Sequence, residues 1–150
     1  MKRAIAATVL LLGAITMLGS TAAQAVTSPV VIHEIYYNSP GSDRGSNASL
    51  NAEWVQLHNN SGHAVTLTHW TVRDRVGHVY TFGTYRLSAH GSVKVHTGHG
   101  SNTQTNRYWR HSWYIWNNDG DGATLKNAGG TVISRCSYSD PSEVRAFKIC

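Results

Sequence analysis

The stretch EWVQLHNNS, which runs from Glu53 to Ser61, decides the fold of this chain. Apolar and polar residues alternate through it, so Val55 and Leu57 share one face of an extended strand while Trp54 lies on the other. The run ends in an Asn-Asn-Ser turn signal, which is typical of a strand boundary. Glu53 falls on the inner face, but it opens the strand, where we expect its carboxylate to contact solvent.

The sequence on both sides of this stretch repeats the pattern of short β-rich runs separated by Gly, Asn, Ser and Asp clusters. No window of residues 26–150 sustains the apolar spacing of an amphipathic helix. We expect a long mobile loop over 38–52 and a hairpin turn at 127–130. Eight short strands are predicted, at Val30–Tyr37, Glu53–Asn59, His69–Asp74, His78–Phe82, Ser92–His96, Trp113–Trp116, Ala123–Lys126 and Thr131–Tyr138. Such a series of strands and turns predicts an all-β sandwich or barrel.

Seven segments, in this order along the chain, resemble the lamin tail domain, an immunoglobulin-like β-sandwich found in nuclear lamins and in secreted bacterial proteins. They are Ile32–Asn38, Glu53–Ser61, Val65–Asp74, Tyr80–Phe82, Leu87–Ser92, Trp116–Leu125 and Val132–Tyr138. The resemblance implies a secreted bacterial single-domain member of this family, with one lamin-tail-like domain over 26–150. It also implies a binding scaffold that carries no catalytic residues of its own. In animal lamins the module is implicated in protein and DNA contacts.

The first 25 residues have the features of a secretory signal peptide. A positive start, MKR, precedes an apolar run from Ala4 to Leu18, and the small-residue pattern AQA ends at Ala25. The apolar run is shorter than the ~20 residues that a membrane-spanning helix needs. We therefore expect residues 1–25 to be removed and the mature chain to begin at Val26. The protein is then secreted and extracellular, with no membrane span.

The charge balance is mildly basic. The formal net charge is +5, from 13 Lys and Arg against 8 Asp and Glu, and it falls to +3 when Lys2 and Arg3 leave with the signal peptide. The nine His add positive charge only below pH ~6.5. This excess is weaker than the concentrated charge of a dedicated nucleic-acid-binding domain, so charge alone does not identify the partner.

Both cysteines, Cys136 and Cys150, lie in the C-terminal part of the chain. An even number of cysteines in an exported chain predicts a disulfide, because compartments outside the cytoplasm do not keep thiols reduced. The bridge would tie the C-terminus to the last predicted strand. Closing a loop of this length stabilises a fold by about 3 kcal/mol in the chain-entropy treatment.

Candidate metal and catalytic motifs are incomplete. The segment NNDGDG at 117–122 matches the first half of an EF-hand calcium loop, but Ala128 occupies the position of the bidentate Glu. An Asx-rich structural turn is the alternative interpretation. The histidines lack the regular spacing of ligands on one strand face, and no nucleophile-elbow motif or acidic metal cluster occurs in the sequence. We expect no metal, no cofactor and no enzymatic activity.

The best candidate contact surface is the segment from Thr105 to Tyr114, which interleaves cationic and aromatic side chains. Rings beside positive charges suit sugars or nucleic-acid bases and phosphates. The alternative is that these aromatic residues pack on the sandwich, as all-β domains often require. The candidate ligand-binding residues are Arg107, Tyr108, Trp109, Arg110 and Trp113.

Three functions remain open at this point. The first, which we expect, is a secreted, non-enzymatic binding, adhesion or scaffold module for an extracellular protein or a cell-wall polymer. The second is weak binding of nucleic acid or another polyanion through Arg107–Tyr114, which would depend steeply on salt. The third is a small extracellular hydrolase, for which the sequence offers no motif.

Overall fold

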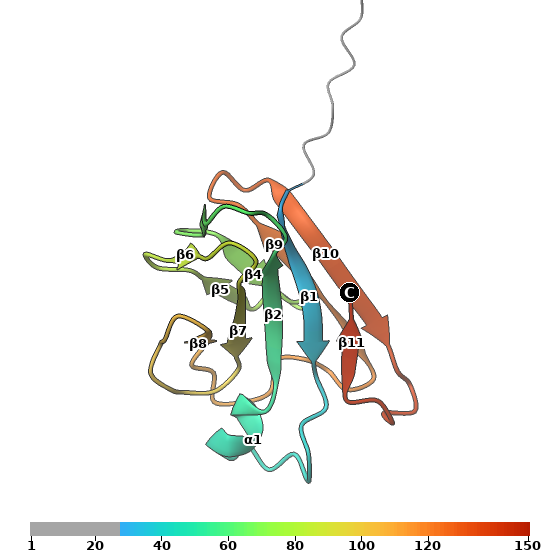
Figure 1. Ribbon diagram of the computed structural model, residues 1–150. Coiled ribbons are helices and arrows are strands. Elements are labelled where there is room, and N and C mark those ends of the chain that lie inside the picture. Colours follow the sequence, from blue (N-terminus) through green and yellow to red (C-terminus); the bar gives the residue numbers. More distant parts are fainter. Residues whose placement is uncertain (1–27) are drawn as a thin grey trace, which may run out of the picture.

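The computed structural model describes residues 28–150 as eleven β-strands and one short helix (Figure 1). The expected signal peptide over 1–25 and the cleavage site before Val26 lie outside the described residues. Within the described part of the chain, no helix has the length and apolar character needed to cross a membrane.

One layer of the fold is a five-stranded sheet with the strand order β11-β1-β2-β7-β8. Its strands are β1 (Val30–Tyr36), β2 (Trp54–Asn59), β7 (Ser92–His96), β8 (Asn106–Tyr108) and β11 (Phe147–Ile149). Neighbouring strands are antiparallel except β7 and β8, which run parallel. The alternation in β2 is as the sequence predicts, with Val55 and Leu57 fully buried and Trp54 partly exposed.

The second layer is a four-stranded sheet with the order β10-β9-β4-β5, and β3 and β6 form a separate two-stranded sheet. The bounds are β3 (Val65–Thr66), β4 (Thr71–Arg73), β5 (Val79–Thr81), β6 (Arg86–Leu87), β9 (Gly120–Lys126) and β10 (Val132–Ser139). The predicted hairpin turn joins β9 to β10, where the Gly130 amide donates to the Asn127 carbonyl at 2.9 Å. Gly130 has φ 82°, a conformation that favours glycine.

The hydrophobic core lies between the two larger sheets. Ile35, Val55 and Val95 face inward from the five-stranded sheet, and Val72 and Leu125 face them from the four-stranded sheet, all with no exposed surface. Each such side chain contributes roughly 1.5–3 kcal/mol when it leaves water. The chain is therefore an all-β, immunoglobulin-like β-sandwich, as predicted.

The strand count differs from the prediction of about eight. Seven predicted strands occur with small shifts in their ends, and β3, β6, β8 and β11 are additional strands of two or three residues. The predicted loop over 38–52 contains helix α1 (Asn47–Asn51), capped by the Ser46 hydroxyl, which accepts from the Ser49 amide at 3.2 Å. The predicted strand Trp113–Trp116 is wrong, because its amides bond to a side chain instead of to a neighbouring strand.

That side chain is Glu53, and the expectation that its carboxylate contacts solvent is also wrong. Glu53 has no exposed surface, and its Oε1 accepts from the backbone amides of Ile115 at 2.8 Å and Trp116 at 2.6 Å. The Thr97 hydroxyl donates to the same oxygen at 3.0 Å. Burial raises the pKa of Glu53 to about 8, although these three donors oppose the rise. The residue at the start of β2 thus fixes the loop that leads into β9.

The predicted disulfide is confirmed. Cys136 on β10 is bonded to Cys150, directly after β11, with their Cα atoms 5.7 Å apart. Because β10 and β11 belong to different sheets, the bond links the two layers along one side of the sandwich.

Candidate functional site

The five residues that the sequence predicts as a ligand-binding cluster do not form one surface. The guanidinium of Arg107 lies over the ring of Tyr85, with its carbon 4.1 Å from the ring centroid. Tyr108 points to the other side of β8 and stacks on His96, with the ring centroids 5.2 Å apart. The alternation of side chains along β8 separates these two neighbours.

The remaining three predicted residues separate further. Trp109 joins the hydrophobic core with only 9% of its surface exposed and packs edge-on against Trp116 at 6.1 Å. Arg110 is exposed and donates from Nη2 to the Gly100 carbonyl at 3.3 Å. Trp113 is 60% exposed and lies in a loop. The alternative interpretation of this segment, packing on the sandwich, describes Trp109.

The outer face of the five-stranded sheet carries a row of five rings, one from each strand. Strand pairing places them at one level, in the order Phe147, Tyr36, Trp54, His96 and Tyr108. Ring centroids are 6.1 Å apart for the first pair, 5.5 Å for the second and 5.2 Å for the last, with planes inclined by 17–27°. Stacked cross-strand pairs of this kind stabilise a sheet.

Lys94 and His96, two polar side chains at this aromatic row, have partners within the protein. Lys94 holds its ammonium 3.6 Å from the centroid of Trp54, a cation–π contact. The ring nitrogens of His96 lie 2.7 Å from the Asn51 carbonyl and 2.8 Å from Oδ1 of Asn106. Together with the stacked pairs, these contacts favour sheet packing as the explanation of the row.

The outer face of the four-stranded sheet is different, because it gathers four cationic side chains around an open hollow of about 430 Å³. Arg73 on β4 and Arg135 on β10 are both paired with Thr124 on the intervening strand β9, so the three residues form one row. Lys126 lies two residues further along β9, and Arg75 follows β4. We call these four residues the cationic face.

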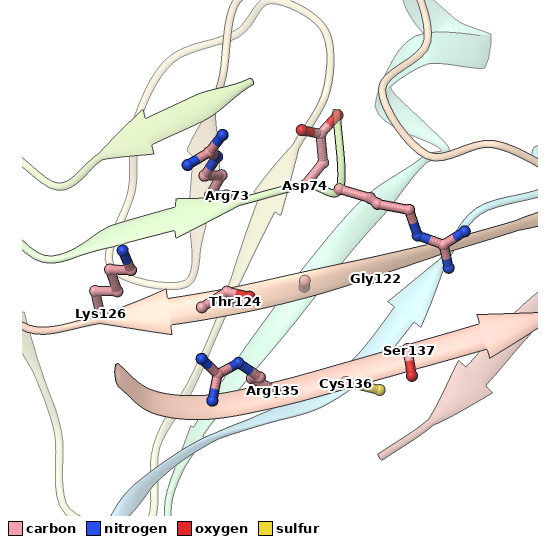
Figure 2. A pocket seen from close by; sticks show the side chains of 10 residues that line it. Arg73, Asp74, Gly122, Thr124, Lys126, Arg135, Cys136 and Ser137 are labelled. Atoms are coloured by element: carbon pink, nitrogen blue, oxygen red, sulfur yellow. The ribbon is translucent and has the colours of Figure 1, made fainter. Parts of the chain in front are cut away.

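Figure 2 shows how three strands build the cationic face. Arg73, Lys126 and Arg135 project from neighbouring strands beside the short side chain of Thr124, with Ser137 further along β10. The small residues Gly122 and Thr124 leave space in the middle of the face. A Cβ at Gly122 would come within 3.1 Å of Ser137 and of the Cys136 carbonyl, so a larger residue there would crowd β10.

Among residues 28–150, no carboxylate forms an ion pair with the four cations of the cationic face. Asp74 also lines the hollow, but its carboxylate accepts from Nδ1 of His78 at 2.5 Å and from the amides of Gly77 and His78. Within residues 28–150, no Lys or Arg lies within ion-pairing distance of a carboxylate, and the contact between Asp74 and His78 is an ion pair only when His78 is protonated. Four cations against the one carboxylate of Asp74 leave an excess of positive charge, which attracts anions.

In the acidic turn at 117–122, the Asp121 carboxylate is already hydrogen-bonded within the protein. The Asp121 carboxylate accepts from the amides of Arg75 and Gly122 and from both the backbone and side-chain nitrogens of Asn117. These bonds agree with the Asx-turn interpretation of this segment. Over residues 28–150, no group of three or more His, Cys, Asp or Glu side chains is arranged to hold a metal ion.

The cationic face is not predicted from the sequence, because its charges are not clustered within one segment. The four residues come from the end of β4 and from the β9–β10 hairpin, two parts of the chain that are far apart in the sequence, and only the strand pairing brings them together. A signal was nevertheless present. Arg73 follows the buried Val72, Lys126 follows the buried Leu125 and Arg135 precedes the buried Cys136. Alternation alone places all three cations on the outer face.

Comparison with known families agrees with this architecture. The family model of the lamin tail domain matches residues 23–140, which include both sheets except β11. No curated protein matches the chain in sequence. The match covers most of the chain and the strands occur in the expected order, so the chain belongs to the lamin tail domain family.

Proposed function

We propose that this protein is an exported, non-catalytic binding module that holds an anionic, phosphate-bearing polymer on its cationic face. The observation that carries the proposal is the set of four cations on one sheet face without a carboxylate partner among residues 28–150. Such a polymer belongs to the class of cell-surface polymers expected from the sequence. The proposed binding residues, however, are those of the cationic face and not the segment Arg107–Tyr114.

The chemistry of the face favours phosphate. Three of the four cations are arginines, whose planar guanidinium binds two oxygens of a phosphate or carboxylate at once. The hydroxyls of Thr124 and Ser137 lie among them and supply further donors. An open face that crosses three strands suits an extended polymer, because successive charged groups of the polymer can contact successive cations of the face.

Export is supported by the charged and apolar start of the sequence and by the Cys136–Cys150 disulfide, which persists in an oxidising compartment. The absence of catalysis is part of the proposal. The Asp74–His78 pair resembles half of a catalytic relay, but Asp74 also accepts two backbone amides and thereby holds the turn between β4 and β5. This pair is explained by its structural role.

The test measures binding of the mature chain to a short DNA duplex, used as a defined phosphodiester polymer, over a range of salt concentrations. The variant Arg73→Gln/Arg135→Gln removes two charges from the face. The control Lys94→Gln/Arg110→Gln removes two charges elsewhere and includes one residue of the sequence-predicted segment. We expect the first variant to bind more weakly and to lower the slope of log K against log salt by about 2, since each lost phosphate contact removes about 0.9.

The control variant should bind like the wild type. If it loses as much affinity as the first variant, binding reflects net charge or the Arg110 segment, and the cationic face is not the site. Polyglutamate, which carries carboxylates only, should bind more weakly than the duplex at equal charge. Equal binding of the two polymers would contradict the preference for phosphate.

A further inference from the structure

A second hollow, of about 360 Å³, lies between the two-stranded sheet and strand β8. Arg86 on β6 and Arg107 on β8 line it, together with the hydroxyls of Thr66, Thr68 and Thr84. The cationic face is formed by the other sheet of the sandwich, and the two hollows share no lining residue.

Arg107 is held in place but lacks a hydrogen-bonding partner at one buried atom. Its guanidinium lies 4.1 Å above the ring of Tyr85, and its Nε is buried with no hydrogen bond. The Tyr85 hydroxyl donates to the Gln104 carbonyl at 2.7 Å, and Gln104 donates from Nε2 to the Arg86 carbonyl at 2.8 Å. These bonds connect the two sides of the hollow and hold the backbone of Arg86 and the ring of Tyr85, on which Arg107 lies, in place.

The electrostatics of the hollow are unbalanced. Two arginines are among the residues that line it, and no Asp or Glu is. Burial raises the pKa of Tyr85, so its hydroxyl remains protonated at neutral pH and offers no negative charge. Bringing two like charges together, and burying a donor without an acceptor, both cost free energy that an anion would recover. Such local violations are expected at binding sites.

We propose that this hollow binds a single phosphate group, with Arg86 and Arg107 as its charge partners. The threonines complete the donor set. Thr68 accepts the Tyr85 amide at 3.2 Å with its oxygen, which leaves its proton free to donate to a ligand. Threonine hydroxyls and two arginine forks match a tetrahedral oxyanion that carries more than one negative charge.

Two sources could supply the phosphate group. It could be free inorganic phosphate, or it could be the terminal phosphate of the polymer bound by the cationic face. In the second case, the hollow would bind the end of the polymer specifically. The two sources differ in a simple way, because free phosphate saturates the site alone, whereas a terminal phosphate makes a phosphorylated polymer bind more tightly than the same polymer without it.

The first test titrates inorganic phosphate into the mature chain in a phosphate-free buffer and follows heat and melting temperature. A ligand that binds only the folded state raises the melting temperature by mass action. Arg86→Gln changes an exposed side chain and should leave the fold intact. Arg107→Lys retains the charge but removes the guanidinium fork and the buried Nε. We expect each change to weaken phosphate binding by about tenfold to a hundredfold.

The matched control is Lys94→Gln/Arg110→Gln, which removes two charges outside both hollows and should leave phosphate binding unchanged. The site is refuted if wild type binds no phosphate, if Arg86→Gln and Arg107→Lys bind as tightly as wild type, or if the control abolishes phosphate binding. Acetate as the titrant should bind far more weakly, and equal binding would refute phosphate specificity. A duplex with and without a 5′-phosphate then separates the two sources, and Arg86→Gln should remove any difference between them.

Discussion

The two outer faces of this sandwich have the same strand geometry but carry different kinds of side chain. On the five-stranded sheet, the side chains at one level are rings that stack on each other, and Lys94 covers Trp54. On the four-stranded sheet, the corresponding positions hold Arg73, Thr124 and Arg135, and the arginines have no carboxylate partner among the described residues. The rings of the first face have one another as partners, whereas the second face carries an excess of positive charge.

The difference shows how a binding face can be separated from a packing face in a β-sandwich. Residue type alone is misleading, because exposed aromatic residues are usually read as contact surfaces. What decides is whether each side chain finds its partner within the protein. The rings of the aromatic row stack on neighbouring rings, whereas Arg73 and Arg135 form no ion pair within residues 28–150.

The largest expected effect tests whether the tryptophans near β8 belong to the core or to a contact surface. Trp109→Ala should lower the free energy of unfolding by about 3–5 kcal/mol, because it empties a site in the core. Trp113→Ala removes a side chain that is 60% exposed and should change stability by less than about 0.5 kcal/mol. Chemical denaturation measures both. A folded, fully stable Trp109→Ala variant would contradict the packing assignment.

The next effect concerns the covalent link between the two faces. Replacing Cys136 and Cys150 together with Ala should lower the free energy of unfolding by about 3 kcal/mol, since the bond closes a loop between residues 14 apart in sequence. The cationic side chains are unchanged, so a variant that remains folded should still bind the duplex. Loss of duplex binding with intact circular dichroism would mean that the face depends on the bond.

Glu53, just before β2, fixes the loop that leads into β9, and it makes stability depend on pH. Its pKa is raised from 4.5 to about 8 in the folded state, so its stabilising contribution is complete below pH 4.5 and is lost as pH rises to 8. Relative to Glu53→Gln, which does not ionise, the wild type should lose roughly 1 kcal/mol per pH unit across that window. Parallel pH profiles for the two proteins would show that the carboxylate is not perturbed.

The smallest effect sharpens the contrast between the two faces directly. Trp54→Leu retains an apolar residue but removes the stack with Tyr36 and the contact with Lys94. We expect a loss of about 1 kcal/mol of stability and no change in affinity for the duplex. Reduced affinity at unchanged stability would assign binding to the aromatic row instead.

The sequence was informative where one residue's environment depends on its own strand. Alternation placed Val55 and Leu57 in the core and Trp54 outside, and the even cysteine count predicted the disulfide. It was uninformative where partners come from elsewhere. The burial of Glu53 depends on amides more than sixty residues away, and these amides also prevent the strand predicted at Trp113–Trp116.

The candidate site was less predictable for the same reason. The segment containing Arg107 and Arg110 is contiguous in sequence, but alternation along β8 and the burial of Trp109 divide it. The cationic face has no contiguous sequence signature, because it depends on the pairing of β4, β9 and β10. Outward positions of predicted strands, compared for charge across the whole chain, would have indicated it.

The most direct test of the central claim is a map of which backbone amides respond when the mature, isotope-labelled chain is titrated with a short DNA duplex at low salt. The account predicts that the largest chemical-shift changes occur at Arg73, Thr124 and Arg135, with Trp54 and Gln56 on the opposite sheet unchanged. Added salt should reverse the changes. Largest changes at Trp54, or along Tyr108–Trp113 with Arg73 and Arg135 unaffected, would contradict it.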